Sequence, residues 1–137
     1  MKKRKVKPVK KEKLEGIGGW LILPTIGLFL AVGLWLFNFV ILGLSLSSEE
    51  SGTYELITFL ISMIMAFLAV YLLVLEFKKK KHFPEWAIAY LWAGVLVTIL
   101  LSVLDGDYSD VFLTVIGAII WTSYFNVSKR VKNTFVN

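Results

Sequence analysis

The chain has 137 residues, of which 57% are hydrophobic and only 18% charged, too little polar surface to cover a soluble domain of this size. The absence of cysteine excludes a disulfide framework, a thiolate nucleophile and a cysteine-based metal site. The formal net charge of +5 resembles that of a nucleic-acid-binding protein. However, the charges separate long apolar runs, and runs of about 20 apolar residues predict membrane-spanning helices.

The N-terminal tail, Met1–Lys13, carries eight of the fifteen Lys and Arg residues, and Pro8 interrupts any helix in it. No apolar face repeats through this segment, so we expect a disordered cytoplasmic tail. A signal peptide is the alternative. The apolar run that follows is too long for a signal-peptide core and no A-x-A-like cleavage site follows it, which favours an uncleaved first span.

The first span is predicted at about 20–44, a length of about 37 Å at the helical rise. The glycine-rich stretch 16–19 is expected to form a short interfacial lead-in, and Pro24 is tolerated in a first turn. Short polar turns separate three further apolar runs. These runs are predicted to be spans at about 54–77, 84–104 and 108–125. In the last turn, Asp105-Gly106 is a turn dipeptide.

The Lys and Arg residues all fall on one side of this topology. They lie in the N-terminal tail, in the turn after the second span and after the fourth span, whereas the two opposite loops hold none. The residues outside the tail are Lys78, Lys79, Lys80, Lys81, Lys129, Arg130 and Lys132. The positive-inside rule therefore places both termini in the cytoplasm.

The predicted fold is an all-α integral membrane four-helix bundle with both termini in the cytoplasm. It comprises a tail (1–15), a four-span domain (16–127) and a basic C-terminal segment (128–137). The two halves repeat the order span, acidic loop, span, basic stop. That pattern is compatible with a true parallel repeat, and equally with two unrelated helical hairpins.

Few residues are candidates for chemistry. Glu55, Glu76 and Glu85 fall within about one turn of a span end; we expect Glu55 to favour a helix N-terminus, and the other two to pair with the lysine turn. Asn38 is the one strongly polar side chain deep in a span, and we expect it to hydrogen-bond another span inside the bundle. The faces that turn inward are predicted from small-xxx-small pairs. These pairs are Gly27/Ala31, Ser62/Ala66, Ala89/Ala93 and Thr114/Ala118.

No catalytic, metal or cofactor site is expected. His82 is the only histidine, and without cysteine or a second histidine it cannot form a conventional zinc site. A catalytic triad would require an aspartate from the opposite side of the membrane. The Gly16–Gly19 cluster lacks the preceding strand of a phosphate-binding loop.

Two blocks of sequence carry a resemblance. Gly18-Gly19-Trp20-Leu21-Ile22-Leu23 resembles the G-G-W-L opening of a family of small bacterial inner-membrane proteins, and residues 121–135 resemble its W-x-x-Y-F-x-x-S-K-R-V-K-x-T-F signature. The family is domain of unknown function 2569, with four predicted spans. The long lysine-rich tail departs from that pattern. The resemblance implies the topology and no activity.

The aromatic residues near the predicted cytoplasmic interface are expected to form an interfacial belt. They are Trp20, Trp86, Trp121, Tyr124 and Phe125. The adjacent Lys129, Arg130 and Lys132 would each contribute about 1 kcal/mol with anionic lipid.

Two classes of function remain. One is a non-catalytic assembly, accessory or interaction module, with anionic lipid, a second copy or another membrane protein as partner. The other is a subunit of a small oligomeric transporter or channel. The absence of a carboxylate in the first span disfavours proton-coupled export of cations, and an enzyme is not expected. Specific nucleic-acid binding is not expected either, because the tail has no aromatic residue to stack on bases.

Overall fold

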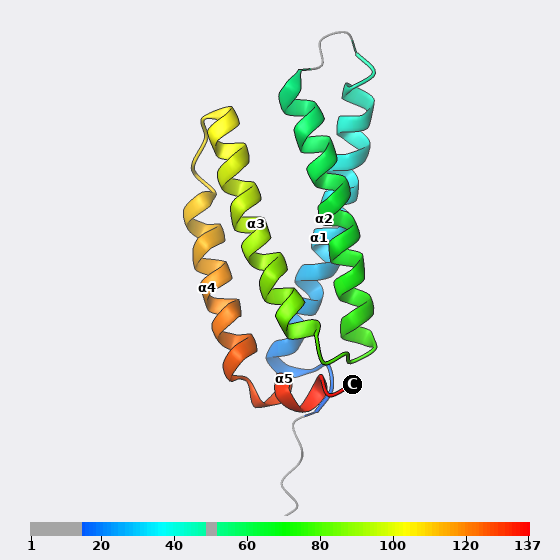
Figure 1. Ribbon diagram of the computed structural model, residues 1–137, viewed down its shortest axis with the longest axis vertical. Coiled ribbons are helices and arrows are strands. Elements are labelled where there is room, and N and C mark those ends of the chain that lie inside the picture. The colour runs from blue at the N-terminus through cyan, green and yellow to red at the C-terminus, as the bar shows by residue number, and fades with distance from the viewer. Residues whose placement is uncertain (1–14, 49–51) are drawn as a thin grey trace, which may run out of the picture.

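The protein is all-helical throughout residues 15–48 and 52–137, the ranges that the computed structural model describes. Four long helices run up and down the molecule, and a short fifth helix crosses one end (Figure 1). The elements are η1 (a 3-10 turn, Gly19–Leu21), α1 (Ile22–Ser45), α2 (Thr53–Phe77), α3 (Phe83–Asp105), α4 (Val111–Val127) and α5 (Lys129–Thr134). The predicted tail 1–13 lies outside the described residues, as do residues 49–51 of the first loop.

The lead-in to α1 is a tight turn, as the glycines predicted. Gly19 has φ +56°, a left-handed conformation that costs glycine little, and a 3-10 turn follows it directly. Pro24 lies in the first turn of α1, where the missing N–H leaves no intrahelical bond unmade.

The lysine turn is held by backbone hydrogen bonds at the end of α2. The N–H of Lys80 donates to the carbonyl of Leu75 at 2.9 Å, and the N–H of Lys79 to that of Glu76 at 2.9 Å, which is the Schellman pattern. Lys79 occupies the left-handed position of this motif, at φ 51°. α3 then begins with Phe83-Pro84, and Phe83 is fully buried.

The turn between α3 and α4 confirms the prediction made for Asp105-Gly106. Gly106 ends α3 in the left-handed conformation, at φ 82°. The Asp105 carboxylate accepts from the N–H of Asp107 at 2.9 Å, and the Asp107 carboxylate from the N–H of Ser109 at 3.0 Å. The hydrogen bond from the backbone of Ser109 holds the pKa of Asp107 below its usual value.

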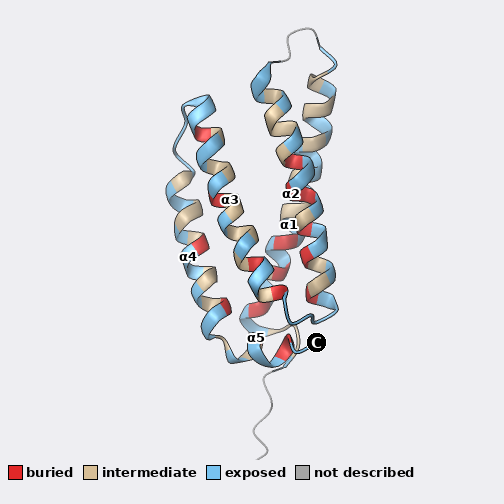
Figure 2. Ribbon diagram, viewed as in Figure 1, coloured by how far each residue is buried: buried red, intermediate tan, exposed pale blue. Residues whose placement is uncertain are grey.

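The bundle consists of two hairpins, α1–α2 and α3–α4, that are joined by packing of α2 on α3. Figure 1 shows the hairpins converging near α5 and separating toward the opposite end. Small residues on α2 allow the close approach to α1: Ser62 and Ala69 are fully buried, and Ala66 nearly so. Buried positions follow the inner faces of the helices and are densest near α5 (Figure 2).

The predicted inward faces are correct on α2 and α4, where Ala66 and Ala118 are buried, and wrong on α3. Ala89 is exposed, and α3 turns Ala87 and Val95 inward instead. Small residues are frequent throughout a hydrophobic helix, so their spacing alone does not decide which of several faces meets a neighbour.

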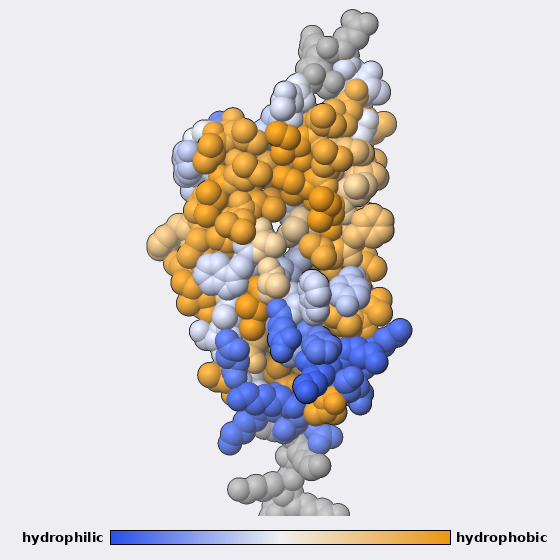
Figure 3. Space-filling model, in the orientation of Figure 1, coloured by the Kyte–Doolittle hydropathy of each residue, from blue (hydrophilic) through white to orange (hydrophobic). Residues whose placement is uncertain are grey.

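The outer surface of the bundle is apolar along its length. Three helices, η1–α1, α2 and α3, are long and apolar enough to cross a membrane, and α4 is a shorter apolar helix of 17 residues. Large side chains such as Phe37, Phe67 and Phe112 are more than 60% exposed on it. In the view of Figure 3, apolar residues cover most of the bundle and hydrophilic residues gather at the α5 end. This surface suits a hydrocarbon solvent, and the protein is a membrane protein with a four-helix bundle fold.

Candidate functional site

The most densely built part of the molecule is the end of the bundle that α5 closes. Ser128 caps α5, its hydroxyl accepting from the N–H of Val131 at 3.4 Å. Val131 and Phe135 are buried against the bundle. The ring of Phe135 lies 4.5 Å from that of Phe83, which in turn meets Phe125 edge-on at 6.0 Å. α5 and Phe135, at the end of the C-terminal signature, therefore form a lid that packs on the core. The short length of α5 and its basic residues did not predict this packing.

The glycine lead-in docks on this lid. The N–H of Gly16 donates to the hydroxyl of Thr134 at 2.9 Å. The guanidinium of Arg130 lies on the backbone of the glycines: a Cβ at Gly18 would come within 3.0 Å of its Nη1, and one at Gly19 within 3.5 Å of its Nε. The two blocks of sequence that carry the family resemblance thus contact each other, through Arg130 and the Gly18-Gly19 backbone. A side chain at Gly18 would require the arginine to shift by a few tenths of an ångström, whereas at Gly19 it is the positive φ that favours glycine.

The predicted aromatic belt divides into two groups. Trp20 and Trp86 are 72% and 46% exposed and remain suitable for an interface. Phe125 is only 5% exposed and belongs to the core beside Phe83, so its assignment to the interface is wrong. Trp121 and Tyr124 are half-buried and pack edge to face. A helix end that is covered by another helix turns part of its aromatic girdle inward, and the prediction did not include that covering helix.

The predicted cationic residues lie at the α5 end. The side chains of Lys78, Lys79, Lys80, Lys81, Lys129 and Lys132 are exposed. Arg130 is half-buried, and its guanidinium donates to the carbonyl of Glu15 at 3.4 Å. Arg130 therefore differs from the six lysines in being held against the backbone of the lead-in.

Glu76 is the residue whose environment departs most from the prediction. Its side chain is fully buried, and Oε1 lies 2.5 Å from the hydroxyl of Thr25 on α1. The expected pairing with the lysine turn is therefore wrong. Glu76 lies one helical turn after the buried Leu72, so it shares the face of α2 that turns toward α1. The other flanking carboxylate, that of Glu85, is exposed and lies 3.6 Å from Nδ1 of His82.

The hydrogen-bond geometry around Thr25 constrains Glu76 further. The Thr25 hydroxyl also lies 2.9 Å from the carbonyl of Leu21, which can only accept. A hydroxyl carries a single proton, so Thr25 either shares that proton between the two acceptors or gives it to Leu21 while a protonated Glu76 donates to Thr25. Within the described part of the chain, Oε2 of Glu76 is buried without a partner.

Asn38 does not face the bundle, contrary to the prediction. It is exposed, and its amide donates to the carbonyl of Leu34 in its own helix at 3.0 Å. α1 is apolar on all sides, so the sequence pattern did not distinguish its inner face from its outer face. The bond one turn back replaces the partner expected on another helix.

Replacing Asn38 by leucine is consequently expected to change the free energy of unfolding by less than about 0.5 kcal/mol, the usual range for an exposed position. Denaturation of the purified protein in detergent micelles measures this. A loss of 1 kcal/mol or more would contradict the exposed position.

Glu55 is confirmed at the N-terminus of α2, where a carboxylate favours the helix dipole. Its side chain accepts from the N–H of Gly52 at 2.9 Å, so it also satisfies a backbone donor that the helix leaves unpaired. This contact accounts for Glu55 as a structural residue.

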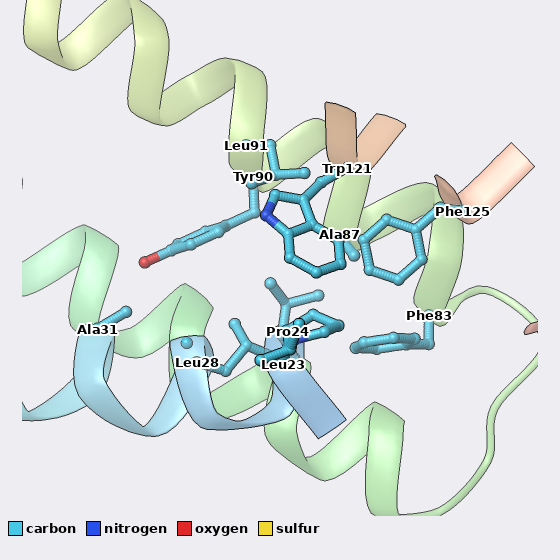
Figure 4. A pocket seen from close by; sticks show the side chains of 12 residues that line it. Leu23, Pro24, Leu28, Ala31, Phe83, Ala87, Tyr90, Leu91, Trp121 and Phe125 are labelled. Atoms are coloured by element: carbon cyan, nitrogen blue, oxygen red, sulfur yellow. The ribbon is translucent and has the colours of Figure 1, made fainter. Parts of the chain in front are cut away.

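Two apolar cavities lie between the hairpins. The first, about 280 Å³, is lined by α1 on one side (Leu23, Pro24, Leu28) and by α3 and α4 on the other (Figure 4). The second, about 300 Å³, shares Tyr90, Leu91 and Trp121 with the first and extends toward the opposite end of the bundle. The indole of Trp35 on α1 donates to the hydroxyl of Tyr90 on α3 across this space.

The lining of both cavities contains neither a carboxylate nor a cationic side chain. A third cavity, polar and about 350 Å³, lies by the α3–α4 turn and includes Asp105, Asp107 and Asp110. In the described ranges, no group of three or more His, Cys, Asp or Glu residues is arranged to hold a metal ion. The arrangement suits binding of apolar groups between the hairpins and of anions at the α5 end.

Comparison with known proteins identifies a family. A search of curated proteins and a search of solved structures each found no match. A family model described as "Protein of unknown function (DUF2569)" matches residues 14–136, a range that includes η1, all five helices and the contact between the lead-in and α5. The chain therefore belongs to the DUF2569 family of proteins of unknown function.

Proposed function

We propose that this protein is a non-catalytic, multi-pass module of the bacterial cytoplasmic membrane that assembles with lipid and with a second copy or another membrane protein. In this proposal the α5 end and both termini face the cytoplasm, and the loops at Ser48 and Ser109 face outward. Two features of the molecule support this assignment: the apolar outer surface of the bundle and the basic end that α5 closes.

The observation that carries the proposal is the placement of charge relative to the bundle axis. The described cations of the lysine turn and of α5 gather at one end, where Figure 3 shows hydrophilic residues. The turn at the opposite end of α3 and α4 carries Asp105, Asp107 and Asp110 and no cation. Excess Lys and Arg in short loops mark the cytoplasmic side, and the anionic inner leaflet attracts them at about 1 kcal/mol each.

A role in assembly is supported by the apolar faces of the bundle that remain open. His82 is exposed on the turn beside Glu85. The outer faces of α1 and α4 are apolar and open in the described part of the chain, where Phe37 and Phe112 are 64% and 70% exposed. Lipid or a second membrane protein satisfies such faces equally well.

A subunit of a small oligomeric transporter or channel is the second candidate. The two cavities between the hairpins favour it, since ligand sites of membrane bundles lie between helices. Their apolar lining suits an uncharged or hydrophobic substrate rather than a cation. Cross-linking of native membranes through cysteines on the outer face of α1 or α4 would show whether an oligomer exists.

The topology gives the direct test of the main proposal. Cysteines at Lys80 and at Ser109, in an otherwise cysteine-free chain, are expected to differ in labelling by an impermeant thiol reagent on intact cells. Ser109→Cys should be labelled at once, and Lys80→Cys only after the membrane is permeabilised. Labelling of Lys80→Cys but not Ser109→Cys in intact cells would reverse the orientation and remove the proposal.

A further inference from the structure

We propose that the cavity between α1 and the α3–α4 hairpin binds one acyl chain of an anionic phospholipid whose phosphate is held by Arg130. This inference depends on the proposed function in one respect: the proposed orientation places the lipid in the cytoplasmic leaflet. It goes beyond general attraction to the leaflet, since it assigns one binding site with defined residues.

The cavity has the shape and polarity that an acyl chain requires. Its volume of about 280 Å³ lies just below the range for ligand sites, about 300–1,000 Å³, and so suits a chain rather than a whole lipid. α1 packs on α2 and α3 on α4, whereas α1 and α4 do not form a packed pair in the described part of the chain. The side between α1 and α4 is therefore not closed by helix packing.

The occupant is indicated by the charge at the foot of the same cleft. Arg130 lies against Gly18 and Gly19, and the cavity begins at Leu23 and Pro24, about one helical turn further along the chain. The guanidinium is half-buried and donates to the backbone carbonyl of Glu15 at 3.4 Å. A guanidinium binds phosphate through paired hydrogen bonds, and a lipid phosphate at headgroup level has its acyl chains directed into the bilayer.

Gly27 makes the cavity testable without disturbing the fold. It lines the cavity, and a Cβ added there meets nothing within 4 Å, so a larger side chain has room to enter. Gly33 lies on the same helix, away from this cavity, and a Cβ there likewise meets nothing within 4 Å. Gly27→Leu therefore occupies the site, and Gly33→Leu is its matched control.

The experiment is native mass spectrometry of the full-length protein in neutral detergent with phosphatidylglycerol or phosphatidylcholine of identical acyl chains. We expect wild-type protein to retain one phosphatidylglycerol in preference to phosphatidylcholine. Arg130→Gln should lower that preference about fivefold, and Gly27→Leu should abolish retention of the bound lipid. Lys129→Gln and Gly33→Leu should retain it, because Lys129 is exposed and reports only general surface attraction and Gly33 lies away from the cavity.

The outcomes separate the site from the wider proposal. If Lys129→Gln lowered the preference for phosphatidylglycerol as much as Arg130→Gln does, the basic face would attract lipid without a defined site. This result would contradict the lipid site but not the proposed function. Equal retention of both lipids, or retention by Gly27→Leu, would also contradict the lipid site. If inorganic phosphate displaced the bound lipid, Arg130 would form a site for free anions, and the lipid assignment would be wrong. Thermal melting of each variant distinguishes lost binding from lost fold.

Discussion

Phe135→Ala is expected to detach the α5 lid and to lower the free energy of unfolding by about 3 kcal/mol or more, the usual cost of truncating a buried phenylalanine. The ring is 4% exposed and stacks near Phe83 at 4.5 Å, on the cluster that also holds Phe125. Removing it leaves a space beside two aromatic rings that α5 alone cannot refill. Thermal denaturation in micelles measures the loss, and faster proteolysis after Lys129 or Lys132 reports the opened lid.

Val136→Ala provides the matched control, because Val136 is the next residue and is 65% exposed. If α5 merely lay on the lipid headgroups, both substitutions would reduce partition into the membrane without exposing the chain end. Equal effects of the two substitutions on stability would therefore contradict the lid.

The helices themselves could be predicted because a membrane imposes strong constraints. Length and hydropathy placed all four long helices, and Gly106 and the glycine lead-in adopt the turns that their sequences predicted. The resemblance at the two ends of the chain also predicted the family, which is confirmed over residues 14–136. These features depend on local composition, which a single sequence records directly.

The packing could not be predicted in the same way. A helix that is apolar on every side gives no periodic signal for its inner face, so Asn38 and Ala89 were placed on the wrong side. The lid was missed because six residues with three cations resemble a solvated end. One signal was available: Val131, Thr134 and Phe135 lie three to four residues apart, the spacing of one helical face.

Glu76 illustrates the same limit for a charged residue. Its position next to four lysines favoured an ion pair, whereas the helical register determined the burial. Charge proximity in sequence predicts an exposed pair only when the side chain faces the turn. Glu76 lies only two residues before the lysine turn, but on the face of α2 that packs against α1.

Glu76→Gln is expected to leave the free energy of unfolding within about 1 kcal/mol of wild type, whereas Thr25→Val should lower it by about 1–3 kcal/mol. The Thr25 hydroxyl lies 2.5 Å from Oε1 of Glu76 and 2.9 Å from the carbonyl of Leu21. We expect its proton to go to Leu21 and Glu76 to donate to the hydroxyl oxygen, rather than one proton to be shared between two acceptors. A glutamine amide donates in the same place. Valine removes the acceptor and leaves a second buried polar atom of Glu76 without a partner, in addition to Oε2.

The protonated acid itself is observable by infrared spectroscopy in reconstituted membranes. We expect a carbonyl band of a protonated carboxylic acid in the wild type that is absent from Glu76→Gln and unchanged in Glu85→Gln, the exposed control. Thr25→Ser retains the hydroxyl and should restore both the stability and the band position that Thr25→Val loses. An infrared spectrum in which Glu76 contributes only carboxylate bands would contradict the hydrogen-bond chain from Glu76 through Thr25 to Leu21. Thr25 would then donate to Glu76, or share its proton between Glu76 and the Leu21 carbonyl, 2.9 Å from the same oxygen.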